Sequence, residues 1–267
     1  MRANPSNAFM IRHCIFAMVL PGMLLISGCA VPNPSDDALP DAVQHNAWAH
    51  QSVTQGSRMD SAAGPWQHYQ LPGKRPTSFT YSRKDGRNTM AVLAQSSASM
   101  LRKKVLVAPQ DLSQLHFSWL VPELIAQADM ALRDADDAPV RIVLAFDGDR
   151  SRFTAKNAML SELSLALTGE PLPYATLMYV WCNTRAPGTV ILNPRTDRIR
   201  KLVVESGAAR LNQWLEYERD IRADFQHAFG EEPGALVGIG IMTDSDNTQS
   251  QTRAWYGPVR LAFRKPN

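Results

Sequence analysis

The chain has 267 residues, of which 45% are hydrophobic and 20% charged, with 28 basic and 25 acidic side chains. This length and apolar content allow one domain of ordinary stability. A net charge of +3 without a large basic cluster excludes nucleic acid as a partner, because nucleic-acid binding needs many cations gathered on one face. The densest basic run, residues 102–104, is predicted to be a solvated turn.

Residues 1–28 have the three parts of a secretory signal peptide. Arg2 and Arg12 give a positive start, residues 14–26 are apolar, and Ser27 and Gly28 are the small residues that precede a cleavage site. The apolar run is shorter than the roughly 20 residues that a membrane span needs. A signal peptide is therefore favoured over a membrane-spanning anchor.

The sequence LISGC at residues 25–29 resembles the lipobox of bacterial lipoproteins. The resemblance implies that cleavage leaves Cys29 as the N-terminus and that its thiol carries lipid, so that the membrane is a partner. In enterobacterial lipoproteins the residue after the cysteine directs sorting, and Ala30 favours the outer membrane. The expected location is the bacterial cell envelope, on the periplasmic side of the outer membrane.

Cysteine usage excludes an intrachain disulfide in the mature chain. Cys14 would leave with the signal peptide and Cys29 would be lipidated, so only Cys182 remains. Removal of residues 1–28 leaves 26 basic and 25 acidic residues, close to neutrality. The stability of the mature protein must therefore come from its hydrophobic core.

Residues 29–64 are predicted to be a flexible tether between the lipid and the folded domain. The segment has no helical or strand periodicity, and it contains three prolines, four aspartates and many small polar residues. Such a composition buries too little apolar surface to offset the entropy of ordering. The domain itself is expected over residues 65–267.

Short apolar runs separated by turn signals follow from Trp66 onward, which is typical of strands. Asp85 and Gly86 lie between two such runs and predict a hairpin. Near-continuous apolar runs indicate strands covered on both faces. The predicted strands are residues 77–82, 89–94, 115–121, 140–146, 175–182, 199–204, 236–242 and 259–264.

Two segments have helical spacing. Residues 158–167 are followed by Gly169 and Pro171, which end a helix, and residues 211–229 are followed by Gly230 and Pro233. The first half of the second segment also fits a strand. The balance predicts a mainly β fold, a jelly-roll-like β-sandwich with one or two short helices.

Several motifs occur in a fixed order and resemble the DUF3047 family of uncharacterised bacterial secreted and envelope proteins. The resemblance covers residues 66–263 and implies fold and compartment, with no established activity. The ending, an apolar strand followed by DSDNT and a last strand, is also similar to jelly-roll carbohydrate-binding modules. The motifs are RIVLAF at 141–146, ATLMYVW at 175–181, VESG at 204–207, ERD at 218–220, FGE at 229–231, GIMTDSDNT at 240–248 and WYG at 255–257.

The best polar cluster is residues 243–248, directly after an apolar strand. Asp244, Asp246 and Asn247 offer oxygen ligands for Ca²⁺ or acceptors for sugar hydroxyls. Asp147 and Asp149 end another strand and would complete a structural Ca²⁺ site if the two loops converge. The alternative, which is favoured, is that these side chains bind their own backbone in Asx turns.

Trp255 and Tyr256 are candidates for a platform that stacks on sugar rings, with core packing as the equal alternative. For Trp181, within an apolar strand, core packing is favoured. Cys182 is interpreted as a small buried hydrophobe rather than a nucleophile.

No nucleophile elbow, zinc-protease motif or phosphate-binding loop is present. Glu205, Glu216, Glu218 and Asp220 could form the acid and base of a glycosidase, but solvated or salt-bridged carboxylates are favoured. The sequence therefore favours a non-catalytic module that binds a glycan or another envelope component through Asp244, Asp246, Asn247, Trp255 and Tyr256. The alternatives are a hydrolase acting on an envelope polysaccharide and a structural lipoprotein that binds another protein.

Overall fold

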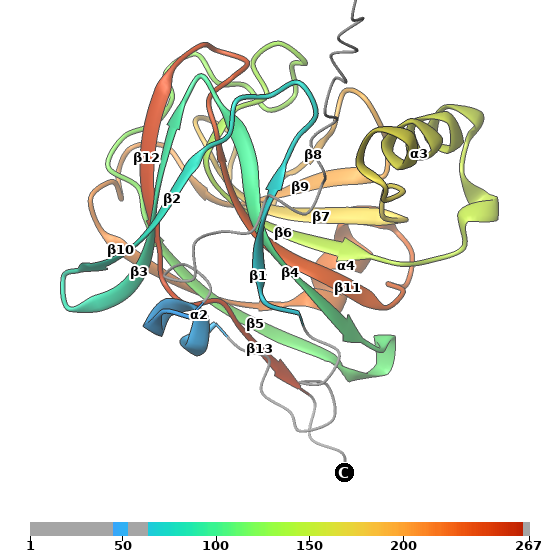
Figure 1. The fold of residues 1–267 in the computed structure, drawn as a ribbon, viewed down its shortest axis with the longest axis horizontal. Helices are drawn as coiled ribbons and strands as arrows, with labels where there is room; N and C mark the ends of the chain where they lie inside the picture. The colour runs from blue at the N-terminus through green and yellow to red at the C-terminus, as the bar shows by residue number, and fades with distance from the viewer. Residues whose placement is uncertain (1–44, 53–63, 264–267) are drawn as a thin grey trace, which may run out of the picture. The chain divides into compact units, whose positions relative to one another are not determined.

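The computed structural model describes residues 45–52 and 64–263, which fall within the compact unit from Asp37 to Asn267. Two β-sheets pack face to face with one hydrophobic core between them (Figure 1). The predicted mainly β, jelly-roll-like sandwich is confirmed. No helix in these two ranges is long and apolar enough to span a membrane.

One sheet has seven strands, all antiparallel except the β7–β9 pair. Central strands β6 and β7 are buried on both faces, as their apolar sequences predict. In spatial order the strands are β1 (Trp66–Gln70), β4 (Ala98–Val107), β11 (Leu236–Asp244), β6 (Ala138–Phe146), β7 (Ala175–Cys182), β9 (Ile199–Ser206) and β8 (Val190–Leu192).

The other sheet has six strands and closes the sandwich. Strand β5 pairs with the end of β12 and then with β13, because the chain leaves the sheet at Gly257 between them. A Cβ atom at Gly257 would lie 2.1 Å from the Ser118 hydroxyl, so a larger residue would require the Ser118 side chain to move. The strands run β10 (Trp214–Asp220), β5 (Leu112–Leu120), β12 (Gln251–Tyr256), β3 (Arg87–Gln95) and β2 (Ser78–Lys84), with β13 (Arg260–Phe263) beside β5.

The hairpin predicted from Asp85 and Gly86 forms between β2 and β3. Lys84 pairs with Arg87, and both turn residues have positive φ, 51° and 77°. These angles match the two-residue turn that suits the twist of the flanking strands, and Asp-Gly adopts it readily.

The basic residues 102–104 are not in a turn, as predicted, but in the middle of β4. Arg102 pairs with Gly240 of β11 along the sheet, and its side chain lies 3.9 Å from the centre of the Tyr69 ring and bonds Glu170. Three consecutive charges are tolerated in this strand because its partners neutralise and cover them.

Three short helices lie in the described ranges. The predicted helix at residues 158–167 is α3 (Ala155–Thr168), which begins at the Thr154 cap and ends at Gly169 with φ 74°. The second helical segment divides at Asp220 into β10 and α4 (Ile221–Phe229). Asp220 ends the strand because its carboxylate accepts the Ala223 N–H and so caps the helix.

The third helix, α2 (Ala47–Gln51), lies inside the segment predicted to be a flexible tether and corrects that prediction. Trp48 is fully buried against Trp66, with ring centres 4.9 Å apart, and its Nε1 donates to the Gly257 carbonyl at 2.9 Å. A single large aromatic residue gives this short polar segment enough apolar area to dock. Cys29, the predicted lipidation site, and residues 30–44 and 53–63 of the predicted tether lie outside the described residues.

Replacing Trp48 with Ala tests this docking. We expect the free energy of unfolding to fall by about 3–5 kcal/mol, the usual cost of removing a buried Trp side chain. Urea denaturation followed by circular dichroism would measure it. His50→Ala, at an exposed position of the same helix, is the control and should change it by less than about 0.5 kcal/mol. Equal effects of the two substitutions would contradict the docking.

Candidate functional site

The main candidate site is a groove on the outer face of the seven-stranded sheet, the face turned away from the core. Side chains alternate across β11, so Ile239 and Ile241 point into the core while Gly238, Gly240 and Met242 line the groove. The groove has a volume of about 740 Å³, within the range of small-molecule sites.

Two glycines leave open space above the middle of the sheet. A Cβ atom at Gly238 would meet only the Ala145 Cβ at 3.5 Å and the Lys103 carbonyl at 3.8 Å. At Gly240 the nearest atom would be the Leu101 carbonyl oxygen at 3.3 Å. Because neither glycine carries a side chain, the floor of the groove is lower along β11 than along its neighbours.

Helix α3 forms one wall of the groove, and its attachment is the reverse of the usual pattern. Its buried residues are polar: Asn157 bonds Asp197 and Thr196, and Ser161 accepts from Arg150. Its large apolar side chains remain exposed, and the groove is lined by Leu160, Leu163 and Leu167. A surface helix normally buries its apolar stripe, so this one is attached by its polar face.

Positive charge predominates around the groove. Eight cationic side chains line it against four anionic ones, and the guanidinium of Arg195 has no partner among the described residues. The cations are Lys74, Arg102, Lys103, Lys104, Arg141, Arg150, Arg195 and Lys201, and the anions are Asp136, Glu170, Asp244 and Asp246.

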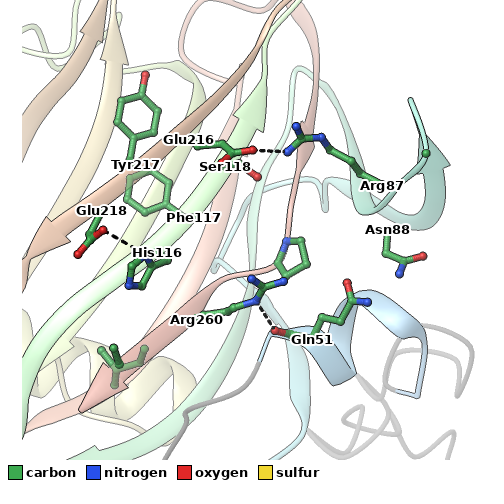
Figure 2. A pocket seen from close by; sticks show the side chains of 14 residues that line it. Gln51, Arg87, Asn88, His116, Phe117, Ser118, Glu216, Tyr217, Glu218 and Arg260 are labelled. Atoms are coloured by element: carbon green, nitrogen blue, oxygen red, sulfur yellow. Dashed lines mark hydrogen bonds and ion pairs between the residues drawn. The ribbon is translucent and has the colours of Figure 1, made fainter. Parts of the chain in front are cut away.

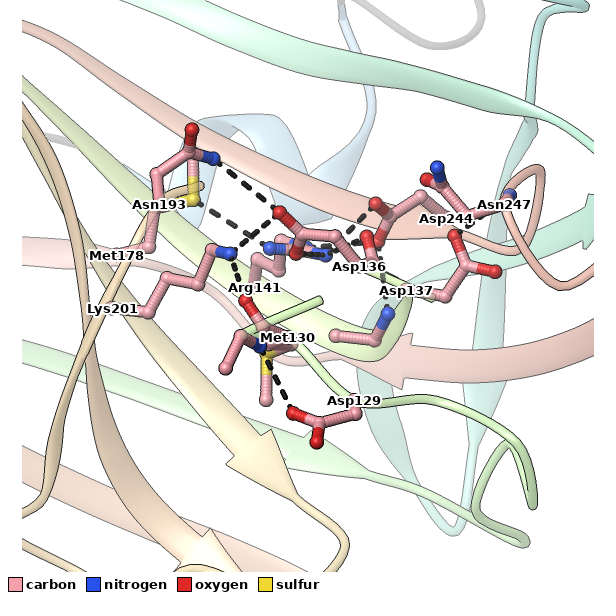
Figure 3. A network of polar contacts seen from close by, with 12 residues as sticks. Asp129, Met130, Asp136, Asp137, Arg141, Met178, Asn193, Lys201, Asp244 and Asn247 are labelled. Atoms are coloured by element: carbon pink, nitrogen blue, oxygen red, sulfur yellow. Dashed lines mark hydrogen bonds and ion pairs between the residues drawn. The ribbon is translucent and has the colours of Figure 1, made fainter. Parts of the chain in front are cut away.

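A buried charge cluster closes one end of the groove (Figure 3). Arg141 is 3% exposed and donates from Nε and Nη2 to the two carboxylate oxygens of Asp244, at 2.8 and 2.9 Å. The same Nη2 donates to the Asp136 carboxylate and carbonyl. The two carboxylates therefore hold one guanidinium between β6, β11 and the loop that precedes β6.

Lys201 completes the cluster from β9. It is fully buried, and its ammonium group donates to Asp136 Oδ2 at 2.6 Å and to the Met130 carbonyl at 2.7 Å. Together with Arg141, it fixes the loop between β5 and β6 on the outer face of the sheet. Sequence reasoning missed both cations. Arg141 is the single charge in the otherwise apolar strand β6, which is a signal of a paired buried group, whereas Lys201 follows Arg200 in β9 and gives no such signal.

Burial shifts the pKa values of this cluster. Burial would lower the pKa of Arg141, but the paired carboxylates of Asp244 and Asp136 raise it above its usual value. Burial raises the pKa of Asp244 to about 7, although Arg141 acts in the opposite direction. Burial, and then repulsion from Arg141, lower the pKa of Lys201 to about 8 against the attraction of Asp136.

The predicted loop residues Asp244, Asp246 and Asn247 lie together at this end of the groove. Asp246 is paired with Lys74, and the Asn247 backbone N–H donates to Asp137. Asp137, which the sequence did not single out, accepts in addition from the backbone and hydroxyl of Thr248. The loop is thus held by the carboxylate of Asp137, which is 110 residues away from Asn247 in the sequence, and not by the predicted Asx turns of its own side chains.

The predicted calcium site does not form from the four aspartates named for it. Asp244 pairs with Ala138 at the start of β6, whereas Asp147 and Asp149 follow its other end. Eight residues at about 3.3 Å each separate the two ends by about 26 Å. Asp137, Asp244 and Asp246 do lie within 4.8 Å of one another, but each is already bonded to protein donors.

The predicted aromatic platform is also corrected. Tyr256 is fully buried, and its hydroxyl donates to the Met242 carbonyl at 2.6 Å and accepts from the Arg141 N–H. It joins the two sheets and cannot face a ligand. Trp255 is half-buried on the other sheet, under Lys84 and Arg253, away from the groove. Trp181 is fully buried in the core, as predicted.

A second pocket, of about 760 Å³, lies over β5 and β10 of the six-stranded sheet (Figure 2). Two of the carboxylates considered for catalysis line it, and both are exposed: Glu216 pairs with Arg87 and Glu218 with His116. Glu205 is buried elsewhere against Arg210 and Tyr217, and Asp220 caps α4. The favoured prediction, carboxylates that are solvated or salt-bridged, fits all four. Cys182 is buried, as predicted.

The model of one family, described as a protein of unknown function (DUF3047), matches residues 64–260. The chain belongs to this family. The resemblance seen in its motifs is thereby confirmed. A comparison with curated proteins gives no match.

Among solved structures, this DUF3047 protein is similar to the xyloglucanase domain of NopAA, a type three effector from Sinorhizobium fredii in complex with cellobiose. The TM-score is 0.40 and the identity 11%, over 75% of this chain and 93% of that chain. A likeness of this size is no evidence about ligand or activity.

The lowered pKa of Lys201 predicts a pH-dependent stability for this DUF3047 protein. Between about pH 8 and 10.5 the folded chain has released the Lys201 proton while the unfolded chain still holds it. Stability therefore rises with pH in this window, since the unfolded state binds more protons there. We expect Lys201→Met to lose this rise, measured by urea denaturation at pH 7, 8, 9 and 10. Parallel pH curves for the two proteins would contradict it.

Proposed function

We propose that this protein is a non-catalytic binding protein of the bacterial envelope, which holds an anionic ligand in the groove of the seven-stranded sheet. The observation that carries the proposal is the excess of cationic side chains around an open groove. Fixed positive charge along a partly enclosed surface attracts anions and raises their rate of association. Acidic glycans and other acidic envelope components have this chemistry.

The carboxylates of the groove support binding rather than catalysis. Asp136 and Asp244 accept from Arg141, Asp246 is paired with Lys74, and Glu170 is bonded by both Arg102 and Lys104. Burial raises the pKa of Glu170, but Arg102 and Lys104 outweigh this effect and lower the pKa below its usual range. A general acid needs a proton to give near neutral pH, but Asp246 and Glu170 are paired with partly exposed cations and Asp136 and Asp244 with the buried Arg141.

The alternative is a hydrolase that uses Glu216 and Glu218, which lie on one face of β10 beside His116 (Figure 2). Their side chains are 67% and 61% exposed. Glycosidases need one carboxyl group whose pKa is raised, usually by an apolar surrounding. The exposure of both groups therefore favours the binding role.

The envelope location rests on the lipobox-like sequence that ends at Cys29. Lipid on this cysteine would hold the domain at a membrane, and two or more acyl chains give stable anchoring. The groove would then be presented to ligands close to that membrane.

Reversing the charge of the groove tests the binding role. We expect the full chain to bind polygalacturonate or dodecanoate in isothermal titration calorimetry, more weakly in 0.5 M salt. Arg195→Glu should weaken binding by about fivefold, since an exposed ion pair contributes up to about 1 kcal/mol.

Arg253→Glu, at an exposed position of β12 on the other sheet, is the matched control. Binding of neither probe by the unaltered protein would contradict the proposal. Release of reducing ends from polygalacturonate, lost in Glu216→Gln or Glu218→Gln, would establish the hydrolase instead.

Cys29→Ser tests the anchor. We expect the unaltered protein to sediment with membranes and to partition into the detergent phase of Triton X-114 when it is produced in a bacterium. The variant cannot be acylated on sulfur and should lose this partitioning. Membrane partitioning that is the same for both proteins would contradict lipidation at Cys29.

A further inference from the structure

The exposed apolar side chains of α3 indicate the chemical class of the groove's ligand. Leu163 and Leu167 are 52% and 61% exposed, although they lie in a well-formed helix. Leaving large leucines in water while Asn157 and Ser161 are buried costs free energy unless something covers the leucines. Exposed apolar patches of this kind mark binding surfaces.

The floor of the groove opposite α3 is apolar as well. Met100, Val143, Met178 and Met242 come from four adjacent strands and point out of the same face of the sheet. Methionine is unbranched and polarisable, so a floor rich in methionine adapts to flexible chains. The two sides together form a channel whose walls are aliphatic.

Aromatic side chains are scarce in the groove. Of the described residues that line it, only Tyr69 is aromatic, and the Arg102 guanidinium already lies 3.9 Å from the centre of its ring. A site for neutral sugar rings would be expected to present an open aromatic face. The lining therefore fits a hydrocarbon chain better than a sugar.

We propose that the groove binds the acyl chain of an acidic amphiphile, with the chain between the α3 leucines and the methionine floor. The acidic group pairs with a cation of the rim, of which Arg195 has no other partner among the described residues. This inference rests on the proposed function and names the ligand class of the same site. Charge complementarity and an aliphatic channel of about 740 Å³ both point to such a molecule.

A chain-length series gives the first test, with octanoate, decanoate and dodecanoate as probes below their micelle-forming concentrations. Each methylene buried in the channel should tighten the dissociation constant, measured by calorimetry, by about three- to fourfold. Dodecanol, which has no charge, should bind more weakly than dodecanoate. Equal affinities along the series would overturn the inference.

The second test compares two leucines of the same helix. Leu163 lines the groove, whereas Leu165 is 44% exposed and is not among the groove residues. We expect Leu163→Gln to weaken dodecanoate binding by about tenfold and Leu165→Gln to leave it unchanged. Both substitutions exchange exposed side chains of similar helix propensity, so both variants should fold, which circular dichroism would check.

The outcomes separate this inference from the proposed function. Binding of polygalacturonate that requires Arg195, without dodecanoate binding, would overturn the acyl ligand and leave the anion-binding groove. Binding of neither probe would overturn both. A dimer that dissociates on Leu163→Gln would show that a second copy covers the leucines. Attachment to phosphatidylglycerol vesicles without binding of monomeric dodecanoate would show that a membrane surface covers them. Either result would overturn the acyl-chain ligand.

Discussion

The outer face of the seven-stranded sheet depends on one buried guanidinium. Arg141 is bonded to Asp244 and Asp136, and its backbone N–H donates to the Tyr256 hydroxyl from the opposite sheet. Loss of the cation would leave the buried Asp244 carboxylate without a cation, since Asp136 would still pair with Lys201, and breaking a buried ion pair typically costs about 3–5 kcal/mol. Because Arg141 binds the loop before β6, it also determines where the groove ends and which polar groups lie there.

The groove and its wall illustrate how polar attachment can leave apolar surface available. Asn157 and Ser161 fasten α3 through hydrogen bonds, so the helix does not need its leucines for docking. These leucines then face the open side of a sheet whose strand β11 carries Gly238 and Gly240. Rim cations surround the resulting channel. An apolar interior with a positive border is the physical basis of both proposals.

Much of the fold could be predicted from local patterns. The Asp85-Gly86 hairpin, the apolar strands β6 and β7 and the end of α3 at Gly169 all follow from turn chemistry, strand periodicity and glycine conformation. The candidate site could be predicted only in part. The loop after β11 was identified, but Asp147 and Asp149 were placed with it wrongly, because strand register decides which ends meet.

The sequence by itself determined the β-rich class, the hairpin, the helix ends and the family motifs, because these depend on residues close together in the chain. It also carries the lipobox-like signal at residues 25–29, which needs no tertiary context to be recognised. Only the tertiary structure decided that Tyr256 is buried, that Trp48 docks, and that Arg141, Lys201 and Asp136 meet. Those outcomes depend on pairings between distant segments, and local propensity carries no information about such pairings.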